Sequence, residues 1–562
     1  MKKRFIFLFS IIICAVSLNS CFEDKSKLPV EGSGIQIDPE GQIANPIRLG
    51  FREELNLSPN VVIGSEVNSE DISCYWELSS GAGGGVFEMI SEERVLDIIL
   101  DHPVSSGFYT LVMTVVDNRT GNRAQRSWNL SISSFGAGII VADTRDGQTG
   151  DITLIMDQVV SEDYEGELSI RYNLNETMTG EALPAPIRSI NYGILGSTYG
   201  AHYNVIMTVL ENNEILYFNC NDYSKSLTFT TTVNINGVNQ TIEVPLELTT
   251  GNILPNRTSS NVPAYITPFT QVNLLVMDEQ LYSNSSVSYS NVTFMNPDAV
   301  TGGNHIDNSV ISVARNPSDV SYAYGPEVIW YDNQEGKMFQ WSYFGDKGVL
   351  TDNTGFNPSN LPGRRAIAGG IAVDGVHHAL LLKNTSEGIY EIYTVQENYD
   401  DWSYVNHPLT TKPVANVPAS VTAAIDASVS CVFSMYESIL FVVTENQIIA
   451  VNFADPFNVT SSVKYTAASG ETMTMGIQFL QGGYHFNASA YGPPEWVENY
   501  GYKPIFPLTA NALVVGVQTG TYSGKVLVIP QKNRGSGDLD VSNITTYPGF
   551  GKITDLTIQS VI

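Results

Sequence analysis

Cysteine is scarce in this sequence. The 562 residues include 5 Cys, and those beyond the N-terminal region are far apart, at Cys74, Cys220 and Cys431. No two of them have the spacing of a zinc ligand pair, and an odd number cannot form a complete disulfide framework. Each lies in an apolar context typical of a strand, so we predict that they are free thiols packed inside the fold.

Basic residues are also few. Lys and Arg number 29 against 58 Asp and Glu, which gives a formal net charge of −29 at pH 7. A field of this sign disfavours nucleic acid and polyphosphate ligands. We therefore expect no nucleic-acid partner.

Motifs of catalysis are missing. The Gly-rich run 81–85 lacks the Lys of a phosphate-binding loop, and neither G-x-S-x-G nor H-E-x-x-H occurs. Among the 7 His, only His377 and His378 are adjacent, and neighbours on a strand point to opposite faces. The sequence therefore indicates a protein that is not an enzyme, with no catalytic residues, no metal site and no cofactor.

The N-terminus has the features of an export signal. Three basic residues precede the apolar run 5–16, which is shorter than the ~20 apolar residues of a membrane-spanning helix. The run is followed by Leu18-Asn19-Ser20-Cys21, which resembles a bacterial lipobox, although Asn19 departs from the usual small residue. The resemblance implies that 1–20 is a lipoprotein signal peptide and that Cys21 carries the lipid anchor. The alternative is an ordinary secretory peptide that contains a cysteine.

Two acids follow the lipobox closely. Glu23 and Asp24 resemble the acidic export tag of Bacteroidota-type lipoproteins. The resemblance implies an outer-membrane location on the extracellular side, with 21–42 as a lipidated linker. A plain polar linker on a periplasm-facing protein is the alternative.

Helical periodicity is absent, and short alternating runs broken by Gly, Asn, Asp and Pro predict an all-β fold. We expect a sandwich of immunoglobulin type over 43–135, with strands at 73–78, 107–117 and 124–132 and a buried Trp76. The runs 75–78, 107–111 and 115–121 resemble those of a PKD-like module, in which G-x-Y, V-x-D and a Gly turn mark the last hairpin.

A strand–turn–strand unit recurs through 136–562. Six clear units lie at 138–155, 205–218, 328–341, 379–393, 439–451 and 512–529, and a fainter one lies at 273–277. Seven units of roughly 60 residues match four-stranded blades with long loops, so we predict a β-propeller, with seven blades preferred. Unrelated hairpins in stacked sandwiches are the alternative, because no WD dipeptide or sialidase Asp-box is present.

The combination of lipobox, acidic tag, PKD-like module and β repeat resembles the PKD-like family surface lipoproteins of Bacteroidota, associated with SusC/SusD-type nutrient uptake systems. The resemblance implies a cell-surface accessory lipoprotein that binds a peptide or glycan cargo, or the SusC/SusD-like transporter complex itself. A propeller-type carbohydrate-active enzyme and an adhesin or structural surface protein stay open as alternatives, because fold alone does not determine function.

Aromatic loops are the best candidate contacts for a ligand or partner, because exposed Tyr and Trp stack on sugars and dominate protein interfaces. The candidates are Tyr322, Tyr324, Tyr399, Trp402, Tyr404, Tyr491, Trp496 and Tyr500.

An acidic turn spans Asp143–Asp151. It could hold Ca²⁺ through its oxygens, but Arg145 opposes a cation, and an Asx-type turn is the favoured interpretation.

Overall fold

The chain is mostly β. The computed structural model describes residues 34–559 except 82–84, 101–107, 134, 161–163, 165–167, 197–201, 213, 221–222, 224–227, 236–237, 246–271, 278–279, 286–301, 304, 314–327, 342–346, 352–353, 374–376, 397–398, 401–404, 407–411, 435–436, 479–511 and 534. The helices within this part are short: η2 (Ser69–Asp71), α2 (Leu174–Thr179) and α3 (Ala419–Asp426). None of the described helices is long and apolar enough to cross a bilayer.

The chain divides into two compact units, Met1–Phe135 and Gly136–Ile562. The strands of the first unit are β1 (Ile35–Ile37), β2 (Ile47–Gly50), β3 (Glu54–Leu57), β4 (Val61–Ile63), β5 (Ile72–Ser79), β6 (Phe87–Ser91), β7 (Leu96–Ile99), β8 (Tyr109–Asp117) and β9 (Arg123–Ser133). They form a sheet in the order β2-β9-β8-β5-β6 and two smaller pairs, β3-β7 and β1-β4. The hairpin of β8 and β9 and its partner β5 confirm the strands expected from alternation.

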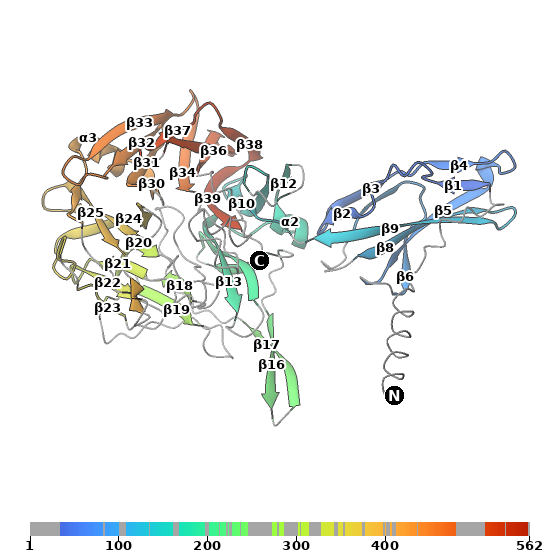
Figure 1. Cartoon of the computed structure of the whole chain (residues 1–562), viewed down its shortest axis with the longest axis horizontal. Helices are drawn as coiled ribbons and strands as arrows, with labels where there is room; N and C mark the ends of the chain where they lie inside the picture. The colour runs from blue at the N-terminus through green and yellow to red at the C-terminus, as the bar shows by residue number, and fades with distance from the viewer. Residues whose placement is uncertain are drawn as a thin grey trace, which may run out of the picture. The chain divides into compact units, whose positions relative to one another are not determined.

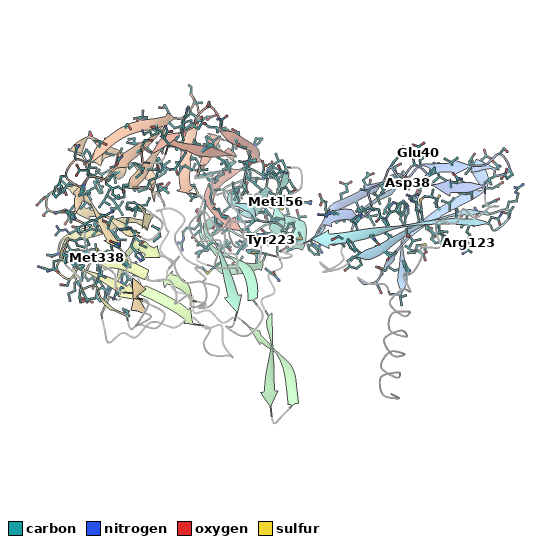
Figure 2. The ribbon with its side chains drawn as sticks, in the orientation of Figure 1. Asp38, Glu40, Arg123, Met156, Tyr223 and Met338 are labelled. Carbon is teal, nitrogen blue, oxygen red and sulfur yellow. The ribbon has the colours of Figure 1, made fainter. Side chains whose placement is uncertain are left out.

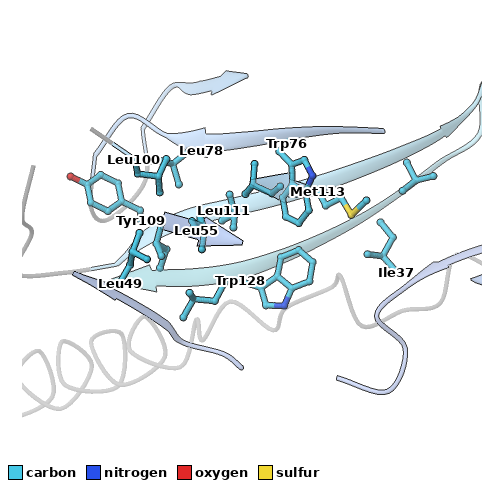
Figure 3. Packing of buried hydrophobic residues seen from close by; sticks show 14 of the residues in the cluster. Ile37, Leu49, Leu55, Trp76, Leu78, Leu100, Tyr109, Leu111, Met113 and Trp128 are labelled. Carbon is cyan, nitrogen blue, oxygen red and sulfur yellow. The ribbon is translucent and has the colours of Figure 1, made fainter. Parts of the chain in front are cut away.

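One hydrophobic core holds the first unit together. Trp76 on β5 and Trp128 on β9 are both buried, and their rings stack with centroids 5.7 Å apart (Figure 3). The indole N–H of Trp76 donates to the carbonyl of Glu93, so this side chain is buried without losing its hydrogen bond. Residues of all three sheets contribute to this core.

The second unit is a series of small antiparallel sheets (Figure 1). The sheets, each written from its first strand, are β39-β10-β11-β12, β13-β14-β15, β20-β21-β22-β23, β24-β25-β26-β29, β30-β31-β32-β33 and β34-β35-β36, with β37 and β38 both paired to β36. Three separate hairpins are β16-β17, β18-β19 and β27-β28. The predicted units correspond to β10-β11, β14-β15, β21-β22, β25-β26, β31-β32 and β35-β36, and the fainter one to β18.

The bounds of these strands are β10 (Gly138–Thr144), β11 (Asp151–Met156), β12 (Ser169–Arg171), β13 (Ile187–Gly196), β14 (His202–Leu210), β15 (Ile215–Asn219), β16 (Thr228–Ile235), β17 (Val238–Pro245), β18 (Val272–Met277), β19 (Gln280–Ser285), β20 (Ile306–Val313), β21 (Val328–Asp332), β22 (Lys337–Trp341), β23 (Gly348–Val349), β24 (Arg364–Ala372), β25 (His377–Asn384), β26 (Ile389–Gln396), β27 (Tyr399–Asp400), β28 (Val405–Asn406), β29 (Ala415–Asn416), β30 (Ser428–Phe433), β31 (Ile439–Thr444), β32 (Gln447–Asn452), β33 (Thr460–Thr466), β34 (Thr472–Gln478), β35 (Ala512–Gly520), β36 (Ser523–Asn533), β37 (Asp538–Leu539), β38 (Thr545–Phe550) and β39 (Lys552–Gln559).

The last strand of the chain completes the first sheet of the second unit. β39 pairs with β10 over most of its length, so the two ends of this unit meet in one sheet (Figure 1). Tyr223, labelled in Figure 2, is buried and donates its hydroxyl to Oε1 of Gln559 on β39 at 2.6 Å. Burial holds the pKa of Tyr223 well above its usual range, so the hydroxyl keeps the proton that it donates.

The first strands of successive sheets contact one another. These contacts run in the order β18, β13, β39, β34, β30, β24 and β20. Four hydrophobic clusters lie between neighbouring sheets, so each of the sheets involved buries a face against the next. Among the described residues, Cys74, Cys220 and Cys431 form no disulfide, and Cys220 and Cys431 are buried, as predicted, whereas Cys74 is only partly buried.

Candidate functional site at one end of the sheets

The topology separates the connections of each sheet into two groups. In an antiparallel meander, the first-to-second and third-to-fourth connections leave from one end of the sheet, and the second-to-third connections leave from the other. We call the end with the first-to-second and third-to-fourth connections the loop end, and the other end the turn end. The loop end is where the first strands β20, β24, β30 and β34 finish.

The loop ends of neighbouring sheets lie together because polar side chains link them. Ser312, near the end of β20, donates its hydroxyl to the carbonyl of Gly370 near the end of β24 at 2.6 Å. Its oxygen also lies 3.0 Å from Nδ1 of His378. Both Ser312 and His378 are buried with no exposed surface, and this Ser–His contact joins two sheets.

A second set of contacts continues from β24 to the last sheet. The amide of Val373 donates to the carbonyl of Glu437, which lies just beyond β30. The buried carboxylate of Glu437 then accepts hydrogen bonds from Ser434, from Gln531 on β36 and from the amide of Gly535. The loop ends of three consecutive sheets are therefore held in one arrangement.

The predicted aromatic contacts belong to connections that start at this end. Segment 314–327 joins β20 to β21, segment 397–414 joins β26 to β29, and segment 479–511 joins β34 to β35. Tyr399 begins the short strand β27. The other candidates, Tyr322, Tyr324, Trp402, Tyr404, Tyr491, Trp496 and Tyr500, lie outside the described residues, as do Cys21, Glu23 and Asp24.

One aromatic residue at the loop end was missed by the sequence analysis. Phe457 lies in the turn between β32 and β33 and is 85% exposed. Its amide donates to Oδ1 of Asp455, and Phe453 in the same turn packs edge-on against Phe433 of the core. The turn is thus ordered while its phenyl ring faces solvent. The Asp-Pro-Phe-Asn sequence of the turn was the available signal.

The turn end is built differently. Its connections are short, and the side chain of a residue at the start of the turn accepts backbone N–H groups further along, as Asp332 and Asn384 do. Asp146 does the same for Gln148 and Thr149, which is the Asx-type turn favoured from the sequence. Those hydrogen bonds lower the pKa of Asp146.

Asp143 and Asp151 flank that turn and are buried. Oδ2 of Asp143 accepts the amide of Gly551 at 2.6 Å, and Arg145 Nε lies 3.9 Å from the same oxygen. Asp151 accepts three backbone amides, two of them from the first turn of α2. Burial raises the pKa of both carboxyls, that of Asp151 to about 6. Within the described residues no group of three His, Cys, Asp or Glu side chains is placed to hold a metal.

Comparisons with known proteins give only distant likenesses. No family model and no curated protein matches the sequence. An auxiliary nutrient binding protein from Bacteroides ovatus is 8% identical over 92% of this chain and 91% of its own, with a TM-score of 0.26. A second, from Bacteroides thetaiotaomicron, is 10% identical over 74% and 83%, with a TM-score of 0.23. The Nup133 β-propeller domain of Vanderwaltozyma polyspora is 11% identical over 60% and 87%, with a TM-score of 0.21.

The chain is therefore similar in structure, at low sequence identity, to auxiliary nutrient binding proteins of Bacteroides. At TM-scores this low, the likeness assigns neither a fold nor a ligand to this chain.

Proposed function

We propose that this chain is a lipid-anchored surface binding protein that serves a SusC/SusD-like outer-membrane nutrient importer. The lipobox ending at Cys21 and the acids Glu23 and Asp24 support anchoring and display outside the cell. The family resemblance in the N-terminal module and the absence of catalytic motifs support a binding role without chemistry.

The second unit is proposed to be a seven-bladed β-propeller that the C-terminal strand closes. Seven first strands follow one another in contact, and β39 pairs with β10 from the start of the unit. Closure of this kind leaves no long unpaired sheet edge and lets each blade cover its neighbour. The first unit, a PKD-like sandwich in this proposal, is a spacer between the lipid and the propeller.

Ligand or partner binding is assigned to the loop end. The single observation that carries this assignment is topological: all eight predicted aromatic contacts belong to connections that leave from the loop ends of the sheets. The exposed ring of Phe457 is at the same end. Aromatic side chains on an ordered base suit the apolar faces of a sugar or the side chains of a peptide, and both cargoes stay within the proposal.

The first experiment is affinity purification of the full-length lipoprotein from detergent-solubilised membranes, with mass spectrometry of its partners. We expect a SusC/SusD-like pair to be recovered. Recovery of the lipoprotein alone would contradict the importer proposal and favour an adhesin or a free-standing binder.

A variant series then tests the loop end. The double variant Trp402→Ala/Trp496→Ala should bind cargo or transporter about tenfold more weakly or worse, because aromatic anchors dominate interface energetics. Tyr522→Ala is the matched control, since Tyr522 is an exposed aromatic side chain in the β35–β36 connection at the turn end. Equal loss in both variants would contradict the assignment. Conversion of a glycan by the wild type would favour the enzyme alternative.

A further inference from the structure

Two buried carboxylates face each other at the turn end. Asp143 on β10 and Asp151 on β11 are paired directly in antiparallel register and are 2% and 7% exposed. Directly opposite residues in such a pair have Cβ atoms ~4.5–5.5 Å apart. Two like charges this close, both removed from water, do not ionise together easily.

The pair connects two other parts of the unit. Asp143 accepts the amide of Gly551, in the connection from β38 to the closing strand β39. Asp151 accepts the amides of Asn175 and Glu176 at 2.8 and 3.0 Å, which are free donors of the first turn of α2. The state of the pair therefore bears on both the closing strand and the helix.

Few hydrogen-bond donors serve the buried oxygens around the pair. Oδ1 of Asp143, Oγ1 of Thr153 and Oδ1 of Asn175 are buried and have no hydrogen-bond partner among the described residues. The hydroxyl of Thr153 acts on Asp143 and lowers the pKa of its carboxyl, but Oδ1 of an ionised Asp143 can only accept. A proton on Oδ1 of Asp143 makes that atom a donor.

Titratable groups on three neighbouring segments bear on the pair. On β39, Lys552 is paired with Thr144. Asp555 is paired with Ala142 and accepts the amide of Ile190. Burial raises the pKa of Asp555 to about 7, so its titration is present in the wild type and in every variant.

Arg145, from the turn itself, lies 3.9 Å from Asp143 and has a half-exposed side chain. Arg145 also sits over the ring of Tyr172, whose pKa burial raises. Glu176 on α2 is exposed.

We propose that Asp143 and Asp151 share one proton, held on Oδ1 of Asp143, and that this proton tightens the attachment of the β38–β39 connection and of α2 at the turn end. Asp143 is the holder because both oxygens of Asp151 already accept backbone N–H groups. A divalent cation fits less well, since Ca²⁺ takes 6–8 oxygen ligands. Arg145 and the amides that point at these carboxylates also repel it.

The direction of the pH dependence follows from the raised pKa values. Burial raises the pKa of both carboxyls, that of Asp151 from 3.8 to about 6, and the charge of Asp143 adds to the shift of Asp151. Stabilisation by the shared proton is fully present below the unfolded value and is lost as the pH rises through about 6. The unfolding equilibrium constant should therefore rise up to about tenfold per pH unit across that window.

The test is urea unfolding of the full chain at several pH values from acid to mildly alkaline. In Asp143→Asn the amide supplies a donor and its carbonyl still accepts from Gly551. This variant should move the pH dependence to lower pH, because the charge of Asp143 adds to the raised pKa of Asp151, and it should be at least as stable as the wild type above pH 6. Asp151→Asn should unfold severalfold more readily above pH 6, because its NH₂ group would face backbone N–H donors. Glu176→Gln, a neutralisation on the exposed side of α2, is the control and should keep the wild-type profile.

Other outcomes overturn the proposal. One is that Asp143→Asn keeps the wild-type pH profile of stability. Another is that Asp143→Asn is as unstable as Asp151→Asn above pH 6. Stabilisation by added CaCl₂ that Asp143→Asn abolishes would assign the site to a cation instead. If Asp143→Asn does not fold, Arg145→Gln replaces it. Loss of the Arg145 charge favours the protonated pair, so the pH at which stability is lost must move upward. An unchanged pH of this transition counts against the proposal.

Discussion

Single buried polar side chains hold the loop end of this molecule in place. Glu437 is 3% exposed, yet its carboxylate accepts donors from its own turn, from β36 and from the segment that follows β36. A buried carboxylate is tolerated because several donors satisfy it. The consequence is that two sheets share one hydrogen-bonded centre below the proposed binding surface.

Glu437→Gln should lower the free energy of unfolding of the second unit by about 1–3 kcal/mol, because one acceptor becomes a donor facing Gln531 or Gly535. Chemical denaturation of the full chain measures the loss. Glu445→Gln makes the same change at an exposed residue of the β31–β32 turn and should stay within about 0.5 kcal/mol of wild type. Similar losses in both variants would show that Glu437 has no special part in joining the sheets.

At the scale of strands, the sequence reveals the middle of each sheet better than its margins. The second and third strands, such as β31 and β32, are nearly continuous apolar runs because neighbouring sheets cover both of their faces. First strands such as β30 are more polar, and fourth strands such as β33 are mostly exposed, so no apolar pattern marks them. Pairing of β39 with β10 joins residues from opposite ends of the unit, which periodicity along the chain cannot indicate.

The candidate site shows the same division. Residue type identified the aromatic loops, but the common end from which they leave follows only from the strand order and the contacts between sheets. The carboxylate pair was visible only as an acidic turn, since the sequence does not show which acids are buried. Phe457 was overlooked because a lone Phe in a polar turn has no periodicity to mark it.

The closing element can be tested at a glycine. Gly138 begins β10 between β11 and β39, and a Cβ added there would lie 2.3 Å from the carbonyl oxygen of Ile155. Gly138→Ala should therefore destabilise the second unit by about 1–3 kcal/mol and increase hydrogen exchange in β10 and β39. Gly520→Ala, whose Cβ would meet nothing closer than 3.5 Å, should change neither measurement. Unchanged exchange in Gly138→Ala would mean that the closing pair is not tightly packed.

At the scale of the whole molecule, the net charge bears on the proposed lipid anchor. A net charge of −29 keeps a chain of this size soluble but gives it no electrostatic attraction to an anionic lipid surface. The membrane attachment proposed above therefore relies on covalent lipid, and one acyl chain alone holds a protein only weakly. The proposed multiple acylation at Cys21 supplies the stable anchor.

Cys21→Ser is the variant that tests this anchor, because serine lacks the thiol that takes up the lipid. We expect the wild type in the membrane fraction, with a mass increased by its acyl chains. The variant should carry no lipid and should be released without detergent. Glu23→Ala/Asp24→Ala should keep the lipid but lose accessibility to a protease added to intact cells, since the acids are proposed to direct export and not lipidation. Protease accessibility that persists in this double variant would contradict the export role, and an unmodified wild type in the soluble fraction would contradict the anchor itself.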